Sequence, residues 1–187
     1  MRNLWFSSDH HFFHKNILKL QRHTRRGETI EEHHELLIEA HNSVVKPNDT
    51  VWFLGDLSFG KSEQTVDILE RLNGVKNIVF GNHDHWLTPV TRSYFASGVN
   101  YHVLKDSEMA VLFHYPIAKW DRMHYGSYHV HGHSHGAYKA EGRILDVGID
   151  NRPNKDMLPW NWDEIVQYME ARPFKERSHK ERKDGNV

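Results

Sequence analysis

Short apolar runs recur along the chain, and most of them end in a cluster of polar residues. β-branched and aromatic residues are frequent in these runs, which indicates strands rather than helices. Strands are therefore predicted within residues 3–11, 50–56, 77–84, 109–116, 128–135 and 143–149. In all but the last of these segments the apolar part comes first, so the predicted strand leads directly into a polar loop.

Segments with helical spacing lie between these strands. Helices are predicted within residues 29–45, 62–74 and 162–174. Thr29 stands three positions before Glu32, which predicts a helix start closed by a capping box. Ser62 is the expected N-cap of the second helix, and Gly74 marks its end.

Strands that alternate with helices predict an α/β fold. With 187 residues, the chain has the length of one domain with one substantial core. The predicted domain spans residues 1–174, and residues 175–187 form a polar segment that we expect to be a flexible tail.

Composition removes several classes of function. The formal net charge of -1 favours neither a nucleic acid nor a membrane surface as a partner. The absence of cysteine excludes disulfides and thiolate metal ligands, which fits the expected cytoplasmic location. We expect no signal peptide, because Asp9 interrupts the N-terminal apolar run, and no run approaches the ~20 apolar residues of a membrane span.

Histidine is unusually frequent, at 17 residues, and the histidines are scattered between His10 and His179. A metal site in this chain has only nitrogen and oxygen ligands to use. Such ligand sets suit manganese, iron, zinc or nickel.

The candidate ligands follow successive predicted strands. They are Asp9 and His11, then Asp56, then Asn82, His83 and Asp84, then His114, and finally His133 and His135. In α/β folds, substrates, cofactors and metal ions bind beyond the carboxyl ends of the strands. Turn formation explains Asp and Asn at such positions but not repeated histidine. The pattern therefore predicts a metal site where these strand ends meet.

The order of these blocks is specific. D-x-H at 9–11, G-D at 55–56, G-N-H-D at 81–84, a single His114 and G-H-S-H at 132–135 follow one another. This order resembles the calcineurin-like metallophosphoesterase family. The resemblance implies two packed mixed β-sheets flanked by helices, in a four-layer α/β/β/α sandwich. It also implies two divalent metal ions, for which manganese is favoured and iron, zinc and nickel are alternatives.

The resemblance also implies roles for single residues. One metal would be held by Asp9, His11, Asp56 and His135, and the second by Asp56, Asn82, His114 and His133. Asp56 would bridge both ions, and a hydroxide between them would attack phosphorus. His83 would protonate the leaving oxygen, and Asp84 would orient His83.

Residues around this site are candidate substrate contacts. They are Asn82, His14, Lys15, Arg25, Arg26 and Tyr115. The basic segment 12–28 is either a solvated face or an arm that steers phosphate toward the metals. The aromatic residues of segment 114–128, among them Trp120 and Tyr128, either stack on a base or pack normally.

The remaining histidines receive structural interpretations. Strand alternation points His10 away from Asp9 and His11. His129 and His131 are expected within a strand. The helix-like run that contains His33, His34 and His41 lacks a zinc-protease motif, and these three histidines are expected on the helix surface.

Two alternatives come from other classes of protein. Residues 55–62, GDLSFGKS, match the phosphate loop of nucleoside triphosphatases. Asp56 would place a negative charge beside the phosphates there, and Leu57 and Phe59 add bulk, so an accidental match is favoured. A non-catalytic metal-binding module is the other alternative, although metal storage does not require His83.

The expected function is hydrolysis of a phosphodiester or phosphomonoester, with a small nucleotide-like substrate. A nuclease acting on DNA or RNA is the alternative, and a protein phosphatase is less favoured in so short a chain. No membrane partner is expected, and the sequence sets no oligomeric state.

Overall fold

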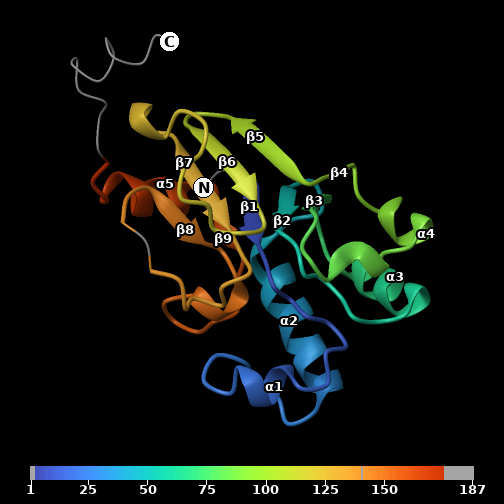
Figure 1. Ribbon diagram of the computed structural model, residues 1–187. Coiled ribbons are helices and arrows are strands. Elements are labelled where there is room, and N and C mark those ends of the chain that lie inside the picture. Colours follow the sequence, from blue (N-terminus) through green and yellow to red (C-terminus); the bar gives the residue numbers. More distant parts are fainter. Residues whose placement is uncertain (1–2, 140, 175–187) are drawn as a thin grey trace, which may run out of the picture.

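The computed structural model describes residues 3–139 and 141–174, and the predicted tail 175–187 lies outside the described residues. Two β-sheets form the centre of the fold (Figure 1). The first has the order β4-β3-β2-β1-β9, and the second has the order β5-β6-β7-β8. The strands of the first sheet are β1 (Leu4–Ser7), β2 (Thr50–Phe53), β3 (Val75–Val79), β4 (Ser97–Val99) and β9 (Trp160–Asn161). Those of the second are β5 (Tyr101–Lys105), β6 (Met109–Phe113), β7 (Tyr128–His131) and β8 (Ile144–Asp146).

Both sheets are mixed. In the first sheet β1, β2, β3 and β4 run parallel, and only β9 is antiparallel to its neighbour β1. In the second sheet β6, β7 and β8 run parallel, and only β5 is antiparallel to its neighbour β6. The predicted fold class, two mixed sheets flanked by helices, is confirmed.

Three longer helices flank the sheets, as predicted: α2 (Ile30–Val44), α3 (Ser62–Arg71) and α5 (Trp162–Glu170). The shorter helices are α1 (Ile17–Leu20), α4 (Pro89–Arg92) and the 3-10 turns η1 (Asp84–Trp86), η2 (Met123–Tyr125) and η3 (Ile149–Asn151). Among the described residues, no helix combines the length and apolar character that crossing a bilayer requires.

The helix starts differ slightly from the expected ones. The Thr29 hydroxyl accepts from the Glu32 N–H, as predicted, but the Glu32 carboxylate accepts from the Glu28 N–H instead of closing the box on Thr29. Lys61, not Ser62, is the N-cap of α3, because its backbone is extended (φ -63°, ψ 162°) while Ser62 is already helical, and the Gln64 side chain accepts from the Lys61 N–H at 2.9 Å. The Ser62 hydroxyl lies 2.8 Å from that of Thr88 and connects α3 to the start of α4.

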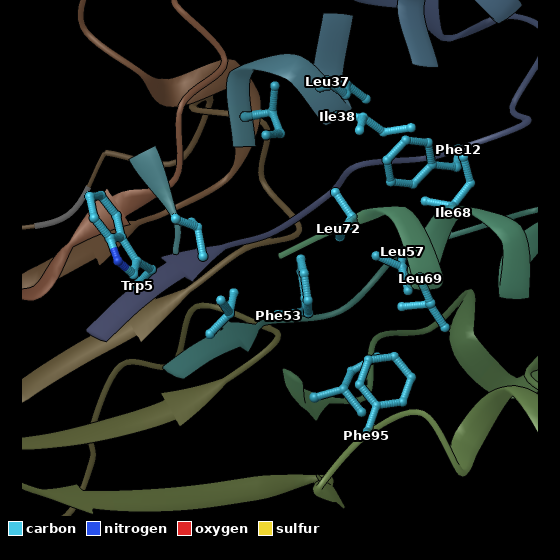
Figure 2. Packing of buried hydrophobic residues seen from close by; sticks show 14 of the residues in the cluster. Trp5, Phe12, Leu37, Ile38, Phe53, Leu57, Ile68, Leu69, Leu72 and Phe95 are labelled. Atoms are coloured by element: carbon cyan, nitrogen blue, oxygen red, sulfur yellow. The ribbon is translucent and has the colours of Figure 1, made fainter. Parts of the chain in front are cut away.

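Alternation along the central strands separates two apolar cores. Trp5 and Phe53 face α2 and α3, where they belong to one cluster with Leu37 and Leu69 (Figure 2). The neighbouring positions point to the opposite face, between the two sheets. That second cluster contains Phe6, Trp52, Leu54, Leu112, Val130 and Ile165. The first sheet is therefore buried on both faces, which is typical of parallel strands in α/β folds.

Strands β4, β5 and β9 were not predicted. β9 has 2 residues and β4 has 3, which is too short for alternation to be visible in the sequence. β5 is an edge strand whose residues are all exposed or half-buried. Pairing with an existing neighbour, rather than local pattern, determines these strands.

The expectation that the histidines of α2 lie on its surface is wrong. The exposed fractions are 0% for His33, 4% for His34 and 2% for His41. His33 Nδ1 lies 2.8 Å from the Arg26 carbonyl, and His34 Nε2 accepts from the Phe13 N–H at 2.8 Å. The segment between β1 and α2 therefore packs against α2 and covers a face that the sequence alone leaves polar.

Acid should destabilise the fold through these buried rings. Burial lowers the pKa of His41, and likewise that of His33, from 6.5 to about 4. In the unfolded chain these rings take up protons near pH 6.5, whereas the folded protein resists protonation until about pH 4. The free energy of unfolding should therefore fall as the pH drops through this window, by up to roughly 3 kcal/mol for His41.

Chemical denaturation at several pH values between 7.5 and 4 measures this loss. His41→Gln keeps a donor for the Asn73 carbonyl, which the His41 ring contacts at 2.9 Å, but it cannot titrate. This variant should show a shallower pH dependence than the wild-type protein. The same change at the exposed His124 serves as control. Equal slopes for His41→Gln and wild type would contradict the assignment.

Candidate metal centre

The candidate ligands stand in the loops that follow β1, β2, β3, β6 and β7. These strands are parallel within their sheets, so their carboxyl ends point to the same edge. The bridge between Ser8 and Gly148 joins the end of β1 to the segment after β8, across the two sheets. Topology therefore brings residues from distant parts of the chain to one location.

Two groups of ligand atoms form there. Asp9, His11 and His135 each offer one ligand atom, and these atoms lie within 4.8 Å of one another. A second group of the same kind contains Asp56, His114 and His133. All six were predicted as metal ligands.

Asp56 belongs to the second group and also approaches the first. Its Oδ2 atom is 3.8 Å from His11 Nε2 and 3.5 Å from His114 Nε2. One carboxylate oxygen thus faces an imidazole of each group, as a bridging ligand requires. The seventh predicted ligand, Asn82, belongs with the second group, because its Oδ1 atom is 3.0 Å from His114 Nε2.

Five of the seven predicted ligand residues have a strained backbone. Positive φ angles occur at Asp9 (57°), His11 (53°), Asp56 (53°), His133 (67°) and His135 (47°). Residues other than glycine adopt this left-handed conformation at a cost of about 1–3 kcal/mol each, and such outliers cluster at functional sites. The left-handed backbone at these positions directs ligand side chains from different loops to one location.

The surroundings of the His11 ring indicate whether a metal fits this site. The residue is 6% exposed, and neither ring nitrogen has a hydrogen-bond partner among the described residues. A buried imidazole without partners is costly, and a cation bound by one of its nitrogens removes part of that cost. Carboxylate, amide and imidazole donors together fit a divalent metal of the manganese, iron or zinc type.

Glycines permit the close approach of these loops. A Cβ atom at Gly132 would lie 1.9 Å from Ser8 Oγ and 2.6 Å from Asp9 Oδ2. A Cβ atom at Gly81 would lie 2.3 Å from Asp56 Oδ1. The glycines of the G-H-S-H and G-N-H-D blocks are therefore required for space beside the two carboxylates.

Both carboxylates are ionised at neutral pH. Burial raises the pKa of Asp56, but the His114 ring, the His83 N–H and the His11 ring outweigh burial and bring that pKa to about 2. Burial also raises the pKa of Asp9, and the neighbouring imidazoles of His11, His135 and His114 reverse the effect and lower it. The site therefore offers two anionic ligands.

The role expected for Asp84 needs correction. Asp84 is fully buried, and its carboxylate accepts from the N–H groups of Asp56 at 2.8 Å, Leu57 at 3.0 Å and Gly81 at 2.7 Å. Both of its oxygens thus accept from backbone donors, and among the described residues no hydrogen bond joins them to the His83 ring. Asp84 instead fastens the loop of Asp56 to the loop of Asn82 and His83.

His83 lies beside the two groups. Its N–H donates to Asp56 Oδ1 at 2.9 Å. Its half-buried ring packs on Phe59, with ring centroids 4.7 Å apart, and lies 5.9 Å from the ring of His11. The backbone is thus fixed by Asp56 and the ring by an aromatic neighbour.

The structure separates the candidate substrate contacts. His14 and Tyr115 are half-buried at the rim, with the His14 ring 5.6 Å from that of His11 and the Tyr115 ring 4.6 Å from that of His133. Lys15 is exposed, and the exposed Arg26 donates to the Lys155 carbonyl at 2.7 Å. Contact with substrate stays a prediction for these residues and for Asn82.

Arg25 is not an exposed phosphate contact. It is 6% exposed, and its guanidinium is paired with Asp150, a residue that the sequence analysis missed. Asp150 also lies 2.7 Å from His135 Nδ1. A signal for it existed, because Asp150 directly follows the last predicted strand, as the other site acids follow theirs.

The other histidines and aromatic residues agree with their packing interpretations. His10 is buried and contacts Phe53, away from the ligand groups, with ring centroids 5.2 Å apart. His129 and His131 are buried positions of β7. Trp120 is half-buried and packs on His129, whereas Tyr128 is fully buried in the core between the sheets, so the Tyr128 ring is not free to stack on a base.

Proteins with similar sequences are known for this chain. No family model matches the chain. The uncharacterized protein MJ1445 of Methanocaldococcus jannaschii is 32% identical over 144 residues, which cover 75% of this chain and 74% of that protein. The gene 66 protein of Mycobacterium phage L5 is 38% identical over 87 residues, 45% of this chain. The matched segment spans 41% of the length of that phage protein.

Solved structures support the architecture. A protein of unknown function, AQ665 from Aquifex aeolicus, superposes with a TM-score of 0.66 at 24% identity and covers 88% of this chain and 98% of its own. The likeness concerns the fold alone. A conserved uncharacterized protein of Streptococcus pneumoniae, described as a predicted phosphoesterase, gives a TM-score of 0.39 at 17% identity, which is too low to carry an argument.

Asp56→Asn should weaken metal binding at both ligand groups together. The change removes a negative charge that faces His11 and His114 alike. We expect a loss of at least about tenfold in affinity at each group. Changing a residue that only hydrogen-bonds to a metal ligand already costs about that much, and Asp56 is expected to be a ligand itself. Calorimetric titration with Mn²⁺ measures both affinities. Asp67→Asn, at an exposed position of α3, is the control, and loss at only one group would contradict the bridging position.

Proposed function

The chain belongs to the same family as the uncharacterized protein MJ1445 of Methanocaldococcus jannaschii, and we propose that it is a phosphoesterase of the calcineurin-like type that depends on two divalent metal ions. The observation that carries this proposal is the pair of adjoining ligand groups that share Asp56. The order of the motif blocks supports it independently.

Each ligand group would hold one ion. Asp9, His11 and His135 would bind the first, and Asn82, His114 and His133 the second, with Asp56 common to both. Bound metals of this kind neutralise phosphate oxygens and lower the pKa of water, which supplies a nucleophile near neutral pH. Nucleophilic serine or cysteine is not required for such chemistry.

The protein groups around the ions have distinct tasks. Asp9 and Asp56 supply negative charge, and the Asp9 carboxylate also accepts from the His133 N–H at 2.9 Å, which ties the two groups together. Asp84 fixes the loop that carries Asp56. His83 would deliver the proton that the leaving oxygen takes up when its bond to phosphorus breaks.

The substrate we propose is a small, nucleotide-like phosphodiester or phosphomonoester. His14 and Tyr115 would contact it at the rim, and the exposed Lys15 and Arg26 would attract its charge. A nuclease activity is the second candidate. The exposed cations of segment 15–26, which continues directly from the loop of Asp9 and His11, favour it.

A screen of phosphate esters tests the proposal. The protein, stripped of metal with a chelator and then supplied with Mn²⁺, should hydrolyse at least one mono- or diester, including cyclic nucleotides in the set. Single-stranded DNA and RNA in the same screen separate the two candidate substrates. Activity should disappear on metal removal and return on Mn²⁺ addition. Failure to hydrolyse any phosphate ester under these conditions would refute the proposal that the protein is a phosphoesterase.

His83→Ala should separate chemistry from metal binding. The His83 ring belongs to neither group of ligand atoms and packs on Phe59, so both metals should remain bound. Loss of a proton donor typically reduces turnover by about 10²–10⁴-fold. Turnover of the best ester from the screen and metal content by elemental analysis check this, with His124→Ala as control. Full activity of His83→Ala would rule out the assigned role, as would equal loss of metal.

A further inference from the structure

Arg25 and Asp150 form an ion pair that is closed off from solvent. Arg25 Nε lies 2.8 Å from Asp150 Oδ1, and Arg25 Nη2 lies 2.6 Å from Asp150 Oδ2. Both side chains are 0% exposed. Two parallel hydrogen bonds of this kind fix the guanidinium and the carboxylate in one plane.

The guanidinium also holds the loop of the first ligands. Arg25 Nη2 donates to the Asp9 carbonyl at 2.6 Å, and Nη1 donates to the His10 carbonyl at 3.1 Å. These carbonyls belong to the turn in which Asp9 and His11 adopt left-handed backbone conformations. Hydrogen bonds to a buried cation stabilise this turn and offset part of its strain.

The carboxylate holds another ligand of the same group. His135 Nδ1 lies 2.7 Å from Asp150 Oδ2, so an Nδ1–H donates to the carboxylate. A proton fixed on Nδ1 leaves the lone pair of Nε2 available for a metal. The Thr24 hydroxyl contacts the other oxygen, Asp150 Oδ1, and so completes the surroundings of the carboxylate.

The contacts of the pair are confined to one ligand group. They reach Asp9, His10 and His135, whereas the loops that carry Asp56 and Asn82 are held by Asp84 through the N–H groups of Asp56 and Gly81. A buried ion pair contributes little net stability compared with apolar residues of the same volume. The retention of such a pair here is explained better by the geometry that it imposes than by stability.

We propose that Arg25 and Asp150 are positioning residues for the metal group of Asp9, His11 and His135, and that the pair sets the tautomer of His135 and the turn of Asp9. The inference rests on the proposed function, because it takes that group to bind a metal. Arginine is required at this position because a lysine ammonium cannot present donors in a plane to a carboxylate and two carbonyls at once.

Zinc binding tests the proposal without use of an activity assay. Zn²⁺ is titrated into the metal-free protein against a competing chromophoric chelator, and the side-chain NMR signals of the histidines report which group is filled. In Asp150→Asn, affinity at the group of His11 and His135 should fall by about 10–100-fold. The group of His114 and His133 should keep its affinity. Arg25→Lys should show the same selective loss.

The Arg152–Asp156 pair provides a matched control. It also joins a buried arginine to an aspartate, at 3.0 Å, but its contacts include Trp160 and Glu164 and not the ligand turn. Asp156→Asn should leave both zinc affinities unchanged. If Asp150→Asn does not fold, the neutral pair Arg25→Gln/Asp150→Asn keeps hydrogen bonding and is titrated in its place.

The wild-type protein gives a readout that no variant can obscure. With zinc bound, the NMR spectrum of His135 should show its proton on Nδ1. A proton on Nε2, or unchanged affinity in the variants, would overturn the positioning role and leave the phosphoesterase proposal intact. Two bound zinc ions without hydrolysis of any ester would overturn the phosphoesterase proposal and leave the positioning role intact. Absence of zinc binding by the wild-type protein would overturn both.

Discussion

The sharing of one carboxylate, that of Asp56, is the constraint on which the rest of the site depends. One oxygen of this residue faces imidazoles of both ligand groups, and the other accepts from the backbone of His83. A side chain in this position cannot shift without disturbing both groups. Its own backbone is therefore fixed in turn, in a left-handed conformation and by a hydrogen bond to the buried Asp84.

The fold supplies this fixation from two directions. Loops at the carboxyl ends of the first sheet bring Asp9, Asp56 and Asn82, and loops of the second sheet bring His114, His133 and His135. Buried carboxylates behind the ligands then connect the loops. Asp84 joins the second and third loops, whereas Asp150, through Arg25, joins the first loop to the last. Rigid sheets and buried acids together determine the position of each ligand.

Histidine has two different physical roles in this chain. At the candidate metal centre, imidazoles lie beside carboxylates, and His11 has no other polar partner among the described residues. In α2 and β7, histidines are buried and pair with backbone groups, as His41 does with the Asn73 carbonyl. Burial lowers the pKa of His129 to about 4, as it does for His41, which keeps these structural rings neutral. Frequency of histidine alone therefore does not identify ligands, and position after a strand does so only together with the neighbouring carboxylates, since His10 also follows β1 but packs against Phe53.

The sequence by itself determined the alternation of strands and helices, the α/β class and the seven candidate ligands. The first two depend on local pattern, namely apolar runs of strand length and helical spacing, whereas the two-sheet architecture and the ligand sets followed from the resemblance that the ordered polar blocks carry. Tertiary structure decided what local pattern cannot encode. Strands β4, β5 and β9 exist because neighbours pair with them, and His33 and His34 are buried because the segment before α2 packs over them. Arg25 became a buried partner of Asp150, 125 positions away along the chain, and Asp84 became a clamp on backbone amides. The sequence does not show whether a charged side chain faces solvent or a buried carboxylate, because only the packing of distant segments distinguishes the two.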